Sequence, residues 1–119
     1  KAPDAAVVFT RDDRGIAPRA YWGGYGGTKA GVAALARELA DEWESRPNLR
    51  VNAVVPGPIR SPLRGRTHPG EERARLPEPA RLVPLYLHLL AGQTKAESAA
   101  LIEARAWLDG GESSRPLVA

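Results

Sequence analysis

Two side chains with the chemistry for proton transfer stand close together near residue 25. Tyr25 and Lys29 are four positions apart where a glycine-rich segment leads into a predicted helix. That spacing places two side chains on one helical face. A lysine ammonium beside a phenol favours the phenolate and makes the tyrosine a better acid or base near neutral pH. The alternative is a solvent-exposed helix start without a chemical role.

The segments around this pair alternate between strand and helix patterns. Apolar, β-prone residues at 5–10 predict a strand buried on both faces. Apolar residues that recur every three or four positions from Thr28 to about Arg46 predict an amphipathic helix. The other expected segments are a loop at 11–24, a strand at 49–57, a long loop at 58–78, a helix at 79–91, a weaker strand at 99–107 and a flexible tail at 110–119.

This order of elements predicts an α/β fold. Crossover connections of this length favour parallel strands and right-handed connections. We therefore expect residues 1–109 to form part of a doubly wound, Rossmann-like parallel sheet with three strands and crossover helices. Ligands on such sheets bind at the carboxyl ends of the strands. The segments 10–25 and 56–66 both follow strands, so we expect them to line one site.

Composition limits the class of protein. The 119 residues fit one globular domain, with 43% hydrophobic and 26% charged residues and no cysteine. The formal charge of +3 comes from arginines that are scattered among acids without interleaved aromatic residues, which argues against a nucleic-acid partner. No segment resembles a membrane span or a signal peptide, so we expect a soluble, cytoplasmic protein with no membrane partner. His68 and His88 lack the spacing of a metal pair, and we expect no metal site.

Three features in order resemble the carboxyl-terminal half of the short-chain dehydrogenase/reductase family, over about residues 4–108. The first is the strand at 5–10 with its loop, and the second is Tyr25-Gly-Gly-Thr-Lys29 at the helix start. The third is "RVNAVVPGPIRS" at 50–61, and the later "VPLYLHLL" helix adds to the likeness. The chain begins with Lys1 and contains no methionine, so we expect it to be a fragment of a longer protein.

The resemblance implies a role for each matching residue. Tyr25 would be the acid/base that exchanges a proton with the substrate oxygen, and Lys29 would bind the nicotinamide ribose and lower the pKa of the tyrosine. The loop that holds the nicotinamide carboxamide would comprise Pro56, Gly57, Ile59 and Ser61, with Ser61 where the family often has threonine. The cofactor would be NAD or NADP and the substrate a small alcohol or carbonyl compound. The helix that carries Tyr25 would pack against a second subunit, which implies a homo-oligomer.

Two departures from the family pattern leave an alternative open. The substrate-orienting serine lies thirteen residues before the tyrosine, and here that position holds Asp12. An ionised carboxylate accepts hydrogen bonds but cannot donate one to a carbonyl, and Thr10 is a possible substitute donor. The chain also has no glycine-rich turn between a strand and a helix to bind pyrophosphate, so we expect the chain alone to bind dinucleotides weakly. The alternative is a diverged, non-catalytic association module.

Overall fold

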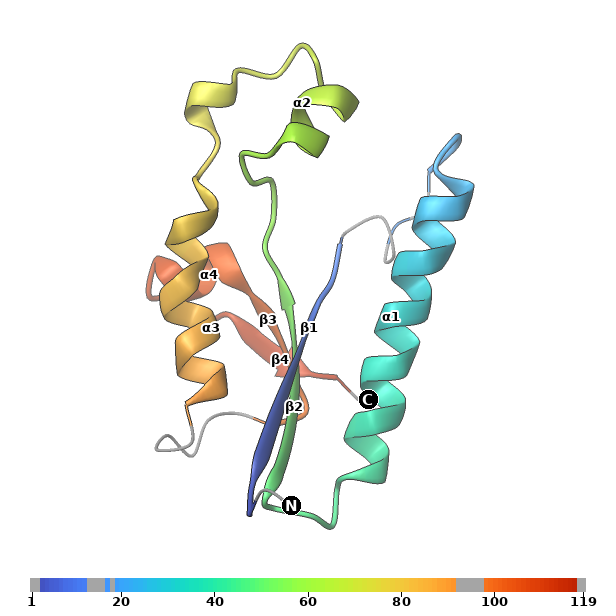
Figure 1. The fold of residues 1–119 in the computed structure, drawn as a ribbon, viewed down its shortest axis with the longest axis vertical. Helices are drawn as coiled ribbons and strands as arrows, with labels where there is room; N and C mark the ends of the chain where they lie inside the picture. Colours follow the sequence, from blue (N-terminus) through green and yellow to red (C-terminus); the bar gives the residue numbers. More distant parts are fainter. Residues whose placement is uncertain (1–2, 13–16, 18, 92–97, 118–119) are drawn as a thin grey trace.

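The computed structural model describes residues 3–12, 17, 19–91 and 98–117. Its centre is a sheet of four strands in the order β1-β2-β3-β4 (Figure 1). The strands are β1 (Ala5–Thr10), β2 (Leu49–Val55), β3 (Ala100–Glu103) and β4 (Ser114–Pro116), and the helices are α1 (Gly23–Glu42), α2 (Pro62–Thr67), α3 (Val83–Leu90) and α4 (Ala104–Leu108). Strands β1, β2 and β3 are parallel, and β4 runs antiparallel to β3.

The sheet separates two apolar layers. Figure 1 shows the sheet between α1 on one side and α3 on the other. Alternate residues of β2 face opposite layers, as the period of a strand requires. The α1 layer contains Ala36, Ala40, Val51, Ala53, Val55, Leu101 and Leu117, and the α3 layer contains Val54, Leu85, Leu89, Ala100, Ile102 and Ala104. The predicted Rossmann-like α/β fold is therefore confirmed, with one more strand than expected.

Helix α1 begins earlier than predicted. Its first residue is Gly23 rather than Thr28, so Tyr25 lies within the first turn. Glycine weakens a helix interior, which is why the glycine-rich segment indicated a turn. In the structure the backbone N–H of Gly26 donates to the carbonyl of Trp22 at 2.6 Å, and Gly26 is buried. Of the glycines at 23, 24, 26 and 27 only Gly26 is buried, and the packing of the rest of α1 on the sheet stabilises the helix despite their low helix propensity.

The segment after β2 contains more regular structure than predicted. Helix α2 and a 3-10 turn at Arg73–Arg75 interrupt the expected loop at 58–78. Arg60 connects the two ends of this segment, because its guanidinium donates to the carbonyls of Arg73, Ala74 and Leu76 and to the carboxylate of Glu78. The expected helix at 79–91 consists of a 3-10 turn at Pro79–Leu82 followed by α3.

The region after residue 99 also differs from the prediction. The strand predicted at 99–107 ends at Glu103, and the helix-favouring residues that follow form α4. Residues 114–116, expected to lie in a flexible tail, pair with β3 as strand β4, and Leu117 is buried in the α1 layer. The buried side chain explains why this segment returns to the sheet.

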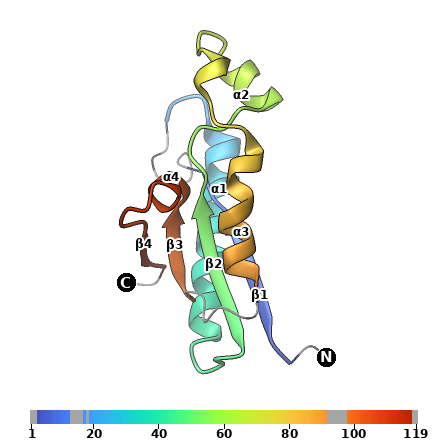
Figure 2. The ribbon, with the colours of Figure 1, turned by 90° about the vertical axis from the view of Figure 1, so that its left-hand side faces the viewer.

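Strand β1 lies at one edge of the described sheet (Figure 2). Its residues Ala5 to Phe9 are only partly buried, whereas Val51 to Val55 of β2 are all buried. Val7 and Phe9 pack against the α1 layer and Val8 packs against the α3 layer, so both faces of β1 are covered, but the strand is less buried than expected. Within the described part of the chain, no helix has the length and apolarity needed to span a membrane.

Candidate active site

The predicted site residues surround one cavity at the carboxyl end of the sheet. The first turn of α1 lies beside the ends of β1 and β2, and α2 lies beyond the end of β2 (Figure 1). The cavity has a volume of about 540 Å³. Its lining includes every residue that the sequence placed in the site, namely Tyr25, Lys29, Pro56, Gly57, Ile59 and Ser61, together with Thr10 and Asp12. The chain therefore brings the two predicted segments to one place.

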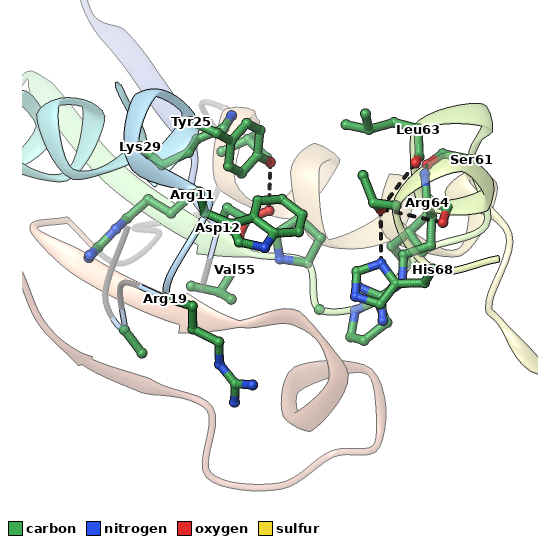
Figure 3. Close-up of a pocket in the computed structure, with 18 of the residues that line it drawn as sticks. Arg11, Asp12, Arg19, Tyr25, Lys29, Val55, Ser61, Leu63, Arg64 and His68 are labelled. Atoms are coloured by element: carbon green, nitrogen blue, oxygen red, sulfur yellow. Dashed lines mark hydrogen bonds between the residues drawn. The ribbon is translucent and has the colours of Figure 1, made fainter. Parts of the chain in front are cut away.

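Tyr25 and Lys29 lie on the same face of α1, as their spacing predicts. The Lys29 ammonium nitrogen is 5.7 Å from the centre of the Tyr25 ring. The Tyr25 hydroxyl donates a hydrogen bond of 2.8 Å to Oδ2 of Asp12, and Figure 3 shows the two groups pointing toward each other. The Asp12 carboxylate is therefore the hydrogen-bond acceptor of the Tyr25 hydroxyl. The family's serine position is thus in contact with the tyrosine, but it carries an acceptor in place of a hydroxyl.

The turn after β2 forms another part of the wall. Gly57 has a φ of 74°, a left-handed conformation that glycine adopts without strain, and no atoms crowd the place where a Cβ would lie. Pro56 and Pro58 have no N–H group, so the donors of this turn are the N–H groups of Gly57 and Ile59. Neither N–H donates to another backbone group within the described residues. Both donors are thus available to a ligand in the cavity.

Ser61 has a structural contact of its own. Its hydroxyl oxygen accepts a hydrogen bond of 3.0 Å from the backbone N–H of Arg64, so it caps the amino end of α2. Pro62 follows at the first helical position, where proline is favoured. The Ser61 O–H can still donate a hydrogen bond, because capping uses only a lone pair of its oxygen.

Aromatic residues join the two sides of the cavity. The ring of Trp22 packs edge-on against Tyr25 with 5.5 Å between centres, and the centre of the His68 ring is 6.3 Å from that of Trp22. The hydroxyl of Thr67 is 2.8 Å from Nδ1 of His68. Trp22, Thr67 and His68 all line the cavity. Contacts between α1 and the segment after α2 thus define its shape.

The arginines of the long segment are largely engaged in ion pairs. Nε and Nη2 of Arg64 donate to both carboxylate oxygens of Glu71 at 2.7 and 2.9 Å. This hydrogen bond lowers the pKa of Glu71 and raises that of Arg64. Arg60 pairs with Glu78 at 2.9 Å. These contacts leave Arg60 and Arg64 less available for an anionic substrate.

Thr10 and Asn52 also have defined partners. The hydroxyl of Thr10, the possible substitute for the family's serine hydroxyl, is hydrogen-bonded to the hydroxyl of Tyr86 on α3 at 2.6 Å. The Asn52 side chain is buried, and its Oδ1 accepts a hydrogen bond from the backbone N–H of Ala100 at 3.1 Å. Asn52 thus joins β2 to the start of β3, which is a structural role.

The sequence placed Trp22 in a segment expected to line the site, but it gave Trp22 no role there and did not assign Thr67 and His68 to the site. The sequence does contain one signal that locates α2, namely Ser61 followed by Pro62, a favourable N-cap and first helical residue. Recognising that helix would have placed Thr67 at its end, close to the predicted site. No comparable signal exists for the contact between Trp22 and His68, because it joins segments that are far apart in the chain.

Comparisons with known proteins identify the family. The short chain dehydrogenase family model matches residues 1–72. The uncharacterized oxidoreductase YciK from Escherichia coli strain K12 is 33% identical over 105 residues, which are 88% of this chain and 41% of that protein. The NADH-dependent L-xylulose reductase from Ambrosiozyma monospora is 37% identical over 103 residues, covering 76% of this chain and 36% of that protein.

A solved structure also shows similarity to the short chain dehydrogenases. The short chain dehydrogenase from Shigella flexneri 2a strain 301, complexed with NADP, superimposes with a TM-score of 0.78 at 32% identity. The match covers 88% of this chain and 43% of that one. The chain thus spans about two fifths of the length of these relatives. The family model matches this chain, the sheet is shared with the solved structure, and Tyr25 and Lys29 lie together on α1. The chain therefore belongs to the short-chain dehydrogenase family.

Proposed function

We propose that this chain forms the catalytic side of an NAD(P)-dependent oxidoreductase that interconverts an alcohol and a carbonyl compound. The observation that carries the proposal is the position of Tyr25 and Lys29 on one face of α1, in the wall of the same cavity as the Pro56–Ile59 turn. A bound nicotinamide would supply or accept the hydride. Tyr25 would give its phenol proton to the carbonyl oxygen during reduction and take a proton from the alcohol during oxidation.

The residues present fit the nicotinamide end of such a cofactor. The N–H groups of Gly57 and Ile59 are suitable donors for a carboxamide oxygen, because they have no backbone acceptor among the described residues. The Lys29 ammonium is a donor for ribose hydroxyls, and its charge stabilises the negative charge that develops on the phenol oxygen. The sequence has no glycine-rich turn for the pyrophosphate, so this chain's residues account for only part of a dinucleotide site.

The hydrogen bond from Tyr25 to Asp12 favours the second candidate, a non-catalytic association module on the same scaffold. While Asp12 accepts the phenol proton, that proton is directed away from a substrate. Asp12 also cannot donate to a substrate carbonyl when it is ionised. Catalysis then requires the substrate oxygen to displace Asp12 as the partner of Tyr25.

Assays of the complete gene product with NADH and NADPH test this proposal. We expect hydride transfer to fall by about 10²- to 10⁴-fold in Tyr25→Phe, the range for loss of a general acid. Tyr21→Phe is the matched control, because Tyr21 lies outside the cavity lining and is fully exposed. We expect Asp12→Ser to raise kcat, since serine removes the competing acceptor and adds a donor. Absence of hydride transfer in both the wild type and Asp12→Ser would favour the association module.

A further inference from the structure

A second cavity adjoins the first at the turn that follows β2. Its volume is about 430 Å³. The four residues of the turn at 56–59 and Leu82 line both cavities, whereas Tyr25 and Lys29 line only the first. A molecule in the second cavity therefore contacts the turn without taking the place of a substrate beside Tyr25.

Three segments that are separate in the chain each bring an arginine and a leucine to this second cavity. They are the end of the 3-10 turn at Arg73–Arg75, the 3-10 turn at Pro79–Leu82, and α4, which supply Arg75 with Leu76, Arg81 with Leu82, and Arg105 with Leu108. Figure 1 shows α4 on the same side of the sheet as α3. The three leucines are buried or partly buried and the three arginines are exposed. The cavity therefore combines an apolar wall with cationic side chains that reach solvent.

Two of the charged residues in this lining already have partners. Glu71 accepts hydrogen bonds on both carboxylate oxygens from Arg64, at 2.7 and 2.9 Å. Nε of Arg75 lies 2.7 Å from a carboxylate oxygen of Glu72. These two pairs are internal to the segment at 64–75, so neither Glu71 nor Arg75 adds much net charge to the cavity.

The charges that remain favour an anion. Arg81 and Arg105 line the cavity and form no ion pair among the residues that the structure describes. Asp109 at the end of α4 is the opposing carboxylate of the lining. Two guanidinium groups thus face one carboxylate, and a guanidinium group is well suited to bind a carboxylate through two parallel hydrogen bonds.

We propose that the second cavity binds a small apolar molecule that carries one carboxylate. Arg81 and Arg105 donate hydrogen bonds to the carboxylate, and the apolar part of the molecule lies against Leu76, Leu82 and Leu108. The volume lies within the range of roughly 300–1,000 Å³ that is typical of sites for small molecules. Two sources share this chemistry, namely a carboxylate-bearing substrate that extends past the turn and a separate carboxylate.

Octanoate is the probe, and 1-octanol, which has the same chain length without the charge, is the reference. Isothermal titration calorimetry on the complete gene product measures both affinities. We expect octanoate to bind at least about tenfold more tightly than 1-octanol, because charge-assisted hydrogen bonds are available only to the carboxylate. Equal affinities would show that the chain only partitions onto apolar surface and would overturn the proposal.

Arginine variants identify the cavity as the place of binding. Arg81→Gln and Arg105→Gln each remove a charge from an exposed side chain and should weaken octanoate binding about tenfold, the size of one hydrogen bond to a charged group. Both should leave 1-octanol binding unchanged. Arg37→Gln is the matched control, because Arg37 is exposed on α1, lies outside both cavities and forms no ion pair among the described residues. An equal loss in Arg37→Gln would attribute the effect to overall charge and overturn the proposal.

Methyl NMR signals provide a second measurement that does not depend on a variant. The methyl signals of Leu108, which lines the cavity, should shift as octanoate is added. Leu87 is 63% exposed on α3 and lies outside the cavity, so its signals should not shift. Equal shifts at Leu87 and Leu108 would show that octanoate binds to exposed apolar surface in general, which contradicts the proposal.

Hydride transfer to octanal and to 8-oxooctanoate distinguishes the two sources of the carboxylate. A higher kcat/KM for 8-oxooctanoate that Arg81→Gln reduces to the value for octanal would show that the substrate carries the carboxylate. Equal kcat/KM values, together with octanoate binding, would show that a separate carboxylate occupies the cavity. This comparison rests on the proposed function. Absence of hydride transfer to both aldehydes would count against that function for these substrates and would leave the calorimetric result to decide the site.

Discussion

The pair formed by Glu71 and Arg64 shows how one residue contact positions part of the site. Arg64 lies in α2, and its guanidinium holds both oxygens of Glu71 beyond the end of that helix. The pKa of Glu71 is lowered mainly by this hydrogen bond and also by the charges of Arg64 and His68. Because Arg64 and His68 both line the cavity, the ion pair holds part of the cavity wall in place.

The contribution of this pair to stability should depend on pH with a defined sign. A carboxyl group whose pKa is lower in the folded state stabilises the fold above its unfolded pKa, about 4.3, and loses that contribution as pH falls through the folded value. In a ¹³C NMR titration, we expect the Glu71 midpoint to lie below that of an unperturbed glutamate. Arg64→Met should raise the midpoint toward the ordinary value.

Arg66→Met is the control for this titration. Arg66 lies in the same helix, is exposed, and forms no ion pair among the described residues. It should leave the Glu71 midpoint unchanged. Equal midpoints in the wild type and in Arg64→Met would contradict the assignment of the shift to Arg64.

At the scale of elements, α3 provides a contrast between buried and exposed leucines. Leu85 is fully buried against β2 and β3, whereas Leu87 on the same helix is 63% exposed. We expect Leu85→Ala to lower the free energy of unfolding by about 2–5 kcal/mol, because it leaves a cavity between the helix and the sheet. Leu87→Ala should change it by less than about 0.5 kcal/mol. Urea denaturation followed by circular dichroism measures both, and similar losses would contradict this packing.

The sequence predicted the elements whose patterns are local and missed those that depend on distant contacts. The apolar period of residues 28–46 and the β-prone residues of 49–57 were sufficient for α1 and β2. Strand β4 has only three residues, all exposed, and it forms because Leu117 reaches the α1 layer. No local pattern contains that information. The glycine-rich first turn of α1 is a similar case, because the packing of the whole helix on the sheet stabilises it and no local pattern predicts it.

The same distinction applies to the candidate site. Tyr25, Lys29 and the turn that begins at Pro56 could be predicted to meet, since both segments follow parallel strands of one sheet. The partner of Tyr25 was only partly predictable, because position 12 was expected near the phenol but the direction of the hydrogen bond was not. The contact between Trp22 and His68 depends on the path of 58–78, which shows no periodic pattern.

At the scale of the whole molecule, two surfaces favour association. The outer edge of β1 has no neighbouring strand in the described sheet, and its residues are only partly buried. Val83, Leu87 and Leu90 form an apolar stripe on α3 and are 50%, 63% and 48% exposed. Unpaired strand edges and contiguous apolar patches both promote contacts between chains. We therefore propose that the chain forms a homo-oligomer.

Light scattering coupled to size-exclusion chromatography tests this proposal. We expect the 119-residue chain to elute as a dimer or larger species at roughly tens of micromolar, because pairing the β1 edge and burying the apolar stripe are both favourable. Leu87→Lys should shift the distribution toward monomer, since a lysine in the centre of the stripe would have to be desolvated in the contact. Ala80→Lys adds the same charge at an exposed position outside the stripe and should have a smaller effect. A monomer at this concentration would contradict association through either surface, and equal effects of the two lysines would attribute dissociation to net charge alone.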